Sequence, residues 1–232
     1  MKIAIVIPTY FRRDKRSRLF LDRCLKSIKW QTHNDYKVFL IGDKYEDTEE
    51  FNYLSTRIID PEKIYWENLS YAKERDLYYS DLEKLWCSGG VNAINYGIEK
   101  ALSEGYEYIC RIDHDDYWAP DHLEKISKFV ENNQDYVLVC SYSLYLNRYI
   151  VPVGIEGTTD YYPEVGNLVH SSTCIKFSDM DIRYRDCFSE IGEVKPADAD
   201  LWERMSDFMR TNNLKGKLLE GVSVYLDKVE KS

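Results

Sequence analysis

The sequence of 232 residues lacks several features that would assign a protein to a class at once. No hydrophobic segment approaches the roughly 20 apolar residues of a membrane-spanning helix, and the apolar N-terminal segment is too short for the core of a signal peptide. The six cysteines form no Cys-X-X-Cys pair, which argues against a zinc site and a dense disulfide framework. Without repeats or a convincing linker, we expect a single cytoplasmic domain over residues 1–232 with reduced thiols.

Positive charge is also scarce. The formal net charge is −9 at pH 7, whereas a protein that binds nucleic acid needs a basic surface for the phosphates. We therefore expect no nucleic-acid partner. A small phosphorylated ligand remains compatible with an acidic chain, because a bound metal ion can supply the missing positive charge.

What the sequence does contain is an alternation of strand and helix patterns. Residues 2–8 and 36–43 are apolar runs typical of parallel strands covered on both faces. Over about the first 140 residues the alternation predicts βαβ units and a mainly parallel sheet, an α/β fold. Further strands are expected at residues 63–69, 106–113, 135–142, 148–153, 168–177 and 218–226, and helices at residues 21–28, 47–54, 91–102, 121–132 and 197–213.

Residues 70–90 interrupt this alternation. They are polar and aromatic, and they show only a weak helical pattern. We predict a long loop or insertion here. Loops of this length inside a compact domain are more often functional than idle.

The densest chemistry lies in residues 111–120, RIDHDDYWAP, where Asp113, Asp115 and Asp116 crowd together. Ligands of open α/β sheets bind at the carboxyl ends of the strands, and both Asp113 and Asp43 follow a predicted strand. Carboxylate oxygens suit Mg²⁺ and Mn²⁺, and substrate phosphates often complete the coordination shell. The cluster therefore predicts a metal site, and the alternative is an acidic turn before the next helix.

Five segments together resemble glycosyltransferase family 2, whose members have the Rossmann-like GT-A fold. In family order they are VIPTY, QTHNDYKVFLIGD, GGVNAINYGIEKAL, RIDHDDYWAPDHL and ADADLWERM. The resemblance implies a metal-dependent, inverting enzyme that moves a sugar from a nucleotide sugar, a UDP-sugar, to a hydroxyl of a glycan or another acceptor. It also implies a nucleotide-sugar-binding half over about residues 1–118 and an acceptor-binding half, with a smaller mixed β region, over about residues 119–232.

The resemblance assigns a set of donor-binding residues. Those expected to contact the nucleotide sugar are Pro8, Thr9, Tyr10, Asp43, Asn92, Asp113 and His114. Asp43 would accept a hydrogen bond from the base, and its alternative role is an Asx turn. Asn95 falls on the apolar face of a predicted helix and needs a polar partner there, either to steady the donor loop or as a satisfied core asparagine.

One position departs from the family pattern. Where the family commonly has an arginine before this asparagine, the chain has Ile94. A cation for the pyrophosphate must then come from elsewhere. The candidates are Arg12, Arg13, Lys73, Arg75 and Lys84.

The resemblance places Mn²⁺ or Mg²⁺ on Asp113, Asp115 and His170. Some GT-A enzymes supply a late histidine as a metal ligand, and imidazole beside two carboxylates favours Mn²⁺. The alternative for His170 is a half-buried strand histidine or an acceptor-pocket residue. Asp116 is expected to face the acceptor or to support the loop. Surface positions are expected for His33 and His122.

Asp198 and Asp200 open the late helix. The resemblance makes Asp198 the catalytic base, which removes the proton of the acceptor hydroxyl. Asp200 competes for that role, because Ala197 stands where the family usually has glutamate before the aspartate. Capping and the helix dipole also favour acids at a helix N-terminus, so a structural role is the alternative.

Two other functions share parts of this pattern. A sugar-phosphate nucleotidyltransferase has a similar sheet and an aspartate-bound metal, but it opens with a glycine-rich loop, and residues 8–18 contain no glycine. A domain that binds a nucleotide sugar without transferring it would not need Asp198 or Asp200. Nothing in the sequence indicates an oligomeric state.

Overall fold

The computed structural model describes residues 1–155 and 161–226. The strands are β1 (Ile3–Thr9), β2 (Tyr36–Gly42), β3 (Ile64–Asn68), β4 (Tyr108–Arg111), β5 (Asp116–Trp118), β6 (Tyr136–Tyr145), β7 (Tyr149–Val151), β8 (Thr173–Lys176) and β9 (Lys215–Leu226). The helices are α1 (Ser17–Lys29), α2 (Thr48–Arg57), α3 (Lys73–Leu77), α4 (Leu82–Ser88), α5 (Val91–Ser103), α6 (His122–Glu131), α7 (Cys187–Ile191) and α8 (Ala197–Thr211). Three short 3-10 helices are η1 (Pro61–Lys63), η2 (His170–Ser172) and η3 (Phe177–Asp179).

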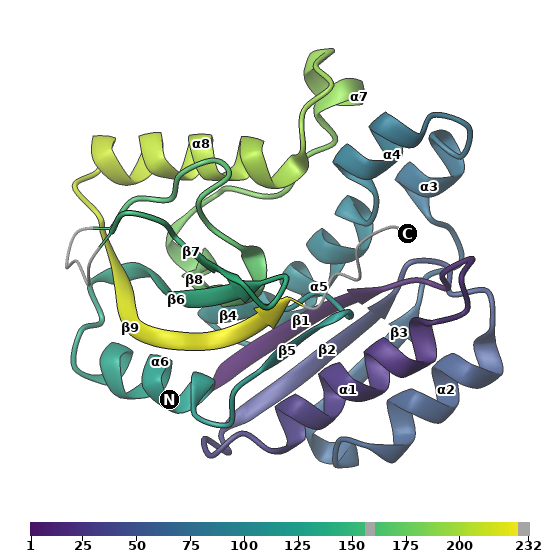
Figure 1. The fold of residues 1–232 in the computed structure, drawn as a ribbon, viewed down its shortest axis with the longest axis horizontal. Helices are drawn as coiled ribbons and strands as arrows, with labels where there is room; N and C mark the ends of the chain where they lie inside the picture. Colours follow the sequence, from purple (N-terminus) through teal and green to yellow (C-terminus); the bar gives the residue numbers. More distant parts are fainter. Residues whose placement is uncertain (156–160, 227–232) are drawn as a thin grey trace.

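These strands form one sheet in the order β3-β2-β1-β4-β8-β6-β9-β5, and β7 pairs with β6 (Figure 1). Strands β1 to β4 are mutually parallel. Strand β8 runs antiparallel to β4 and β6, and β5 runs antiparallel to β9. The predicted α/β fold, with a mainly parallel sheet and a mixed second half, is confirmed.

The order of the strands creates a binding site at one edge of the sheet. From β1 the chain moves outward to β2 and β3, and then returns to β4 on the other side of β1. Where the direction of winding reverses, the connections after neighbouring strands diverge and leave a crevice at the carboxyl ends. The segments that follow β1, β2 and β4 meet there.

Side chains of β1 pack alternately on the two faces of the sheet. Ile3, Ile5 and Ile7 join residues of α1, α2 and α6 in one core cluster, whereas Ala4 and Val6 join residues of α5 and α8 in another. Figure 1 shows α1 and α2 on one side of the sheet and α8 on the other. Because helices cover both faces, β1 is apolar at nearly every position, and this is why the sequence identified it.

Helix α5 lies close against the sheet because Gly97 faces it. A Cβ at this position would lie 2.6 Å from Val6 Cγ1 and 3.1 Å from Ile41 Cγ1. Glycine thus permits an approach that a larger side chain would prevent. The close packing holds the first residues of α5, Val91 and Ile94 among them, at the edge of the sheet where the site forms.

The loop predicted for residues 70–90 is wrong, because α3 and α4 occupy most of it. These helices have five and seven residues, too few turns to produce a hydrophobic period in the sequence. The strand predicted over residues 168–177 is too long. Strand β8 begins only at Thr173, because η2 precedes it. The short elements β5 and α7 were not predicted.

His122, predicted at the surface, is buried. Its ring stacks on Trp118 with 4.4 Å between the centroids, and its Nδ1 lies 2.8 Å from Ser223 Oγ. Burial lowers the pKa of this histidine to about 3, so the ring is neutral and structural.

The six cysteines are free thiols, as predicted, and five of them are buried. Among the helices in residues 1–155 and 161–226, none is both long enough and apolar enough to cross a membrane.

Candidate active site

One cavity collects most of the predicted site residues. It has a volume of about 480 Å³ and lies between the ends of β1, β2 and β4, helix α4, and the first residues of α5 and α8. The predicted residues that line it are Pro8, Thr9, Tyr10, Asp43, Asp113, His114, Asp115, His170 and Asp198. Two others, Asn92 and Asp200, lie outside its lining.

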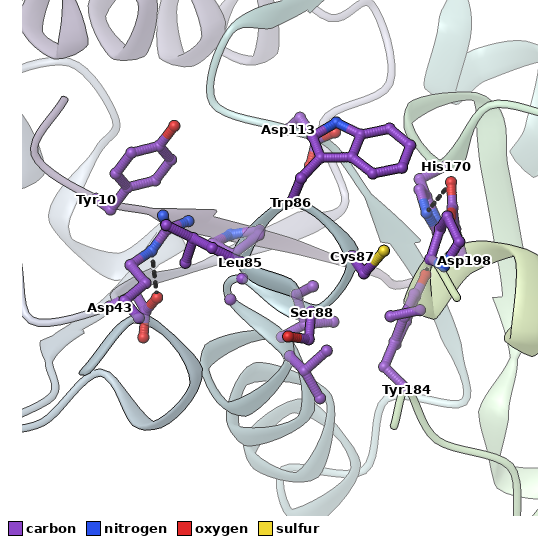
Figure 2. A pocket seen from close by; sticks show the side chains of 18 of the residues that line it. Tyr10, Asp43, Leu85, Trp86, Cys87, Ser88, Asp113, His170, Tyr184 and Asp198 are labelled. Carbon is purple, nitrogen blue, oxygen red and sulfur yellow. Dashed lines mark hydrogen bonds and ion pairs between the residues drawn. The ribbon is translucent and has the colours of Figure 1, made fainter. Parts of the chain in front are cut away.

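Figure 2 shows how these side chains are distributed. Tyr10 and Asp43 lie at one end of the cavity, and His170 and Asp198 lie at the other, with Trp86 between them. The residues expected to bind a nucleotide are therefore separated from the expected base, as a substrate that spans the cavity would require.

A turn fixed by Asn68 places Asp43. The Asn68 side chain accepts a hydrogen bond from the Tyr45 backbone N–H at 2.7 Å and donates one to the Tyr45 carbonyl at 2.9 Å. Gly42 is required next to it, because a Cβ there would collide with Asn68 Oδ1. The turn points the Asp43 carboxylate into the cavity.

Arg75 of α3 reaches Asp43 at this end of the cavity. Its Nε donates to Asp43 Oδ2 at 2.7 Å, and its guanidinium carbon lies 3.5 Å from the centroid of the Tyr10 ring. Burial raises the pKa of the Asp43 carboxyl, and Arg75 opposes the rise. Asp43 Oδ1 is buried and has no hydrogen-bond partner within the described residues, so it can accept a donor from a ligand.

His114 lies near the same end. It is 4% exposed, and its ring meets the Tyr10 ring edge-on with 5.1 Å between centroids. Burial lowers the pKa of His114. Its Nε2 has no partner in the part of the chain that the structure describes, which leaves a polar atom available to a ligand.

Asp113 and Asp115 follow β4 and line the middle of the site. Asp113 Oδ1 accepts a hydrogen bond from Arg111 Nη2 at 2.6 Å, and Asp115 Oδ2 lies 3.5 Å from Arg12 Nη1. Their side chains are 29% and 21% exposed, so a ligand can reach both. In proteins, Mg²⁺ is usually bound by one or two carboxylates, and substrate phosphates complete its coordination shell. Asp113 and Asp115 fit this role. No group of three or more His, Cys, Asp or Glu side chains in the described chain is placed to hold a metal ion.

Asp116 supports this loop. It is fully buried and accepts a hydrogen bond from Ser171 Oγ at 2.5 Å. Ser171 Oγ also accepts the Asp113 backbone N–H at 3.0 Å, and the Ser171 carbonyl accepts the Trp118 indole N–H at 2.7 Å. The loop after β4 is thus tied to η2.

His170, the third predicted metal ligand, uses both ring nitrogens within the protein. Nε2 lies 3.2 Å from Asp198 Oδ2, and Nδ1 lies 2.9 Å from Tyr184 Oη. Burial, followed by the charge of Arg111, lowers the pKa of His170. A neutral ring with its proton on Nε2 would donate to Asp198 and accept from Tyr184. Neither nitrogen is left for a metal while these bonds persist.

Asp198, in the first turn of α8, is ionised and accessible. Burial alone would raise the pKa of its carboxyl. The hydrogen bonds from His170 and from the Ala199 backbone N–H, together with the charge of Arg111, outweigh burial and hold this pKa well below its usual range. The side chain is 42% exposed and lines the cavity, so it can accept a proton from a bound hydroxyl.

Asp200 has different surroundings. Its carboxylate is 1% exposed and is held by Arg185 on Oδ1 and by Arg204 on Oδ2, the second at 2.7 Å. It lies outside the cavity lining. We therefore retain Asp198 as the candidate base and assign Asp200 to a buried ion pair.

The asparagines of α5 have structural contacts. The backbone N–H of Asn92 donates to Glu74 Oε2 at 3.2 Å. The side chain of Asn95 donates to the Tyr184 carbonyl at 2.7 Å and accepts the Tyr184 N–H at 3.1 Å. Asn95 therefore has the second of its two predicted roles, a core asparagine whose polar atoms are satisfied within the protein.

The cavity residues that were not predicted include Arg111, Tyr184 and Trp86. Arg111 could have been predicted from the sequence. Alternate residues of a strand lie on the same face, and Asp113 follows two residues after Arg111. The other two come from segments without a regular pattern. Of the five cations proposed for a pyrophosphate, Arg75 is the one among the cavity's lining residues.

The sequence model of the family described as glycosyl transferase family 2 matches residues 70–193 of this chain. The chain is 34% identical over 221 residues to the uncharacterized glycosyltransferase R139 of Acanthamoeba polyphaga mimivirus, which covers 91% of this chain and 88% of that protein. It is 32% identical over 131 residues to the uncharacterized glycosyltransferase YwdF of Bacillus subtilis strain 168, over 56% of this chain and 39% of the relative.

Two solved structures share the fold. S. aureus TarS 1–349, in complex with UDP-GlcNAc, superposes with a TM-score of 0.70 at 16% identity, over 100% of this chain and 60% of TarS 1–349. The mannosyltransferase PcManGT of Pyrobaculum calidifontis, in complex with GDP-Man and Mn²⁺, gives a TM-score of 0.62 at 10% identity, over 99% of this chain and 58% of that chain. The chain spans less than two thirds of the length of both.

The fold and the relatives define the protein as a glycosyltransferase with the GT-A fold. More narrowly, the matches to the family and to the viral relative show that the chain belongs to glycosyltransferase family 2. The family expected from the sequence is confirmed.

The different surroundings of the two aspartates lead to a prediction about stability. Asp200→Asn should lower the free energy of unfolding by about 3 kcal/mol, because two guanidinium groups lose a buried partner. Asp198→Asn should lower it by less than Asp200→Asn does, because the Asp198 side chain is 42% exposed and water screens its charge. Urea unfolding at pH 7 measures both.

The pH dependence provides a second check of this assignment. The pKa of Asp200 is lowered in the folded chain despite its burial, because Arg185 and Arg204 favour its charged form. Its contribution to stability is therefore present above the ordinary aspartate pKa and is lost as the pH falls. The difference between wild type and Asp200→Asn should shrink in acid. Equal unfolding free energies of the two variants at pH 7 would contradict the assignment.

Proposed function

We propose that this glycosyltransferase moves a sugar from a UDP-sugar to a hydroxyl group of a glycan, with inversion at the anomeric carbon. The observation that carries the proposal is the composition of the cavity. It holds a buried carboxylate oxygen open to a ligand beside an aromatic ring, two carboxylates suited to a divalent cation, and an ionised aspartate at the far end.

Asp43 and Tyr10 would form the nucleobase subsite. The open Oδ1 of Asp43 suits a single N–H donor such as the imide of uracil, and the Tyr10 ring offers a stacking surface. The complex of TarS with UDP-GlcNAc supports a uridine nucleotide, although the fold also accommodates GDP-Man in PcManGT. We therefore expect UDP-sugars to be preferred.

Arg75 would supply the cation that the sequence lacks before Asn95. Gly89 lies two residues before the start of α5, and Arg75 Nη2 lies 3.5 Å from the position that a Cβ on Gly89 would take. The positive charge of Arg75 is therefore close to the N-terminus of α5. The guanidinium covers the Tyr10 ring. A base that stacks on Tyr10 would use the face opposite this guanidinium or displace it toward the diphosphate.

Asp113 and Asp115 would hold Mn²⁺ or Mg²⁺, which when bound would stabilise the negative charge of the departing nucleoside diphosphate. Arg111 and Arg12 balance these carboxylates in the protein itself.

Asp198 would act as the general base at the other end. It accepts the proton of the acceptor hydroxyl while the hydroxyl oxygen forms a bond to the anomeric carbon. The bond from that carbon to the diphosphate oxygen breaks, and its electron pair leaves with the nucleoside diphosphate. Attack from the face opposite the leaving group inverts the configuration.

Trp86 would bind the acceptor. Its side chain is 76% exposed, which is unusual for a residue that mostly buries its ring, and it lines the same cavity as Asp198 (Figure 2). An exposed indole provides a flat apolar surface that can cover the C–H face of a sugar ring. This position favours a glycan as the acceptor.

The reaction can be tested by incubating the chain with UDP-sugars or GDP-sugars, oligosaccharide acceptors and Mn²⁺. We expect a nucleoside diphosphate to be released together with a glycosylated product. Asp198→Asn should lower kcat by about 10²- to 10⁴-fold, the usual contribution of a general base. Release of pyrophosphate from a nucleoside triphosphate and a sugar phosphate would instead indicate a nucleotidyltransferase, and binding without release would indicate a binding domain.

The acceptor subsite makes a separate prediction. Trp86→Ala should raise KM for the acceptor about 3- to 10-fold, the range expected for one lost stacking contact, and should leave KM for the donor unchanged within about twofold. Trp30→Ala is the matched control, because Trp30 is 66% exposed but lies outside the cavity lining. Equal effects of the two variants on the acceptor KM would remove Trp86 from the acceptor subsite.

A further inference from the structure

A chain of hydrogen bonds leads from the scaffold to the candidate base. Asn95 on α5 holds both backbone groups of Tyr184. The Tyr184 hydroxyl lies 2.9 Å from His170 Nδ1, and His170 Nε2 lies 3.2 Å from Asp198 Oδ2. The four residues come from α5, the segment before α7, η2 and α8. The hydrogen bonds therefore connect four separate parts of the fold.

The ring of His170 is held in place by its neighbours. It is 9% exposed, with ring centroids 5.1 Å from Trp202 and 5.3 Å from Tyr184. Trp202 lies one turn after Asp198 on α8, so the ring packs against the helix that carries the aspartate. A buried ring that packs against two aromatic side chains and is bonded at both nitrogens keeps a fixed orientation, with Nε2 toward the carboxylate.

The tyrosine determines which nitrogen of His170 carries the proton. A phenol that donates to Nδ1 leaves the proton of the neutral ring on Nε2. Arg111 lies over the Tyr184 ring, with 5.2 Å between its guanidinium carbon and the centroid. This positive charge disfavours a second proton on His170. The ring is therefore a neutral donor aimed at Asp198.

Both oxygens of Asp198 then have one fixed donor. Oδ1 accepts the Ala199 backbone N–H at 2.9 Å, and Oδ2 accepts His170 Nε2–H. Two donors fix the plane of the carboxylate, and each oxygen keeps a further lone pair for an acceptor hydroxyl. Orientation of the base is what an in-line attack requires.

We propose that His170 and Tyr184 are positioning residues that orient Asp198 and keep it ionised, and that His170 is not a metal ligand. The inference rests on the proposed role of Asp198 as the base. It gives functions to the histidine and the asparagine that the sequence singled out. It also predicts that the two residues act together, since Tyr184 reaches Asp198 through His170.

The catalytic test compares His170→Leu, His170→Gln and Tyr184→Phe in the full chain. His170→Leu removes the donor to Asp198, so the acidic limb of the pH profile of kcat/KM should move up by about one unit or more. His170→Gln keeps an N–H near the position of Nε2 and should recover part of the shift. Tyr184→Phe keeps the ring and its backbone contacts with Asn95, and should lower kcat about tenfold with donor KM unchanged.

Controls separate this role from others. Tyr161→Phe, which alters a buried tyrosine outside the cavity lining, should leave kcat unchanged. The Mn²⁺ concentration for half-maximal activity should be the same in wild type and His170→Gln. A rise of tenfold or more in that concentration, or a loss of kcat without movement of the acidic limb, would overturn the proposal.

A spectroscopic test does not need turnover, so it distinguishes failure of this inference from failure of the proposed function. The chain has four histidines, and long-range ¹H–¹⁵N correlation spectra report the tautomer of each. His170→Gln identifies the signal of His170. We expect the neutral Nε2–H form at pH 7 in wild type and a mixture of tautomers in Tyr184→Phe. A charged ring or an Nδ1–H form in wild type would contradict the proposal.

Discussion

Four carboxylates share one cavity, and each is held by a basic or imidazole side chain. The pairs are Asp43 with Arg75 at 2.7 Å, Asp113 with Arg111 at 2.6 Å, Asp115 with Arg12 at 3.5 Å, and Asp198 with His170 at 3.2 Å. Carboxylates gathered at one site repel one another, and each partner offsets part of this repulsion. The partners come from α3, β4, the segment after β1, and η2. The reversal of strand order at β1 gathers the segments that carry Asp43, Asp113 and Asp115, and η2 and α8 bring His170 and Asp198 to the same cavity.

This pairing also explains how an acidic chain can receive a diphosphate. The net charge of −9 describes the whole molecule, whereas a ligand in the cavity meets carboxylates that already have positive neighbours. The proposed enzyme thus combines a nucleobase end, where Arg75 stands in front of α5, with a base end, where the proposed neutral His170 donates a hydrogen bond to Asp198. The carboxylates at the two ends have different kinds of partner. Asp43 is paired with the positive charge of Arg75, whereas Asp198 would accept a hydrogen bond from a neutral imidazole. That difference suits a donor with a charged diphosphate and an acceptor with a neutral hydroxyl.

The parts of this account that could be predicted follow from local sequence. Apolar strands were recognisable because both faces of the sheet are covered, and Asp43 and Asp113 were found because they follow such strands. The rest depends on contacts between distant segments. Asp198 and Asp200 stand at the same helix start, and only the arginines around Asp200 separate their roles. The partners of His170 could not be predicted either, because Tyr184 comes from a segment without a regular pattern and Asp198 from the start of a separate helix, and only the fold brings them to the ring. Helices α3 and α4 were missed because short helices carry little periodicity.

The central claim is that this cavity binds a uridine diphosphate through Asp43 and a cation held by Asp113 and Asp115. Calorimetric titration of UDP into the full chain, with and without Mn²⁺, tests it most directly. The account predicts that Mn²⁺ strengthens UDP binding to wild type by about tenfold or more, an added 1.4 kcal/mol. Asp115→Asn should lose this gain, and Asp43→Asn should weaken UDP binding with and without the metal. The account would be contradicted by UDP binding that ignores Mn²⁺ and both substitutions, or by a chain that does not bind UDP.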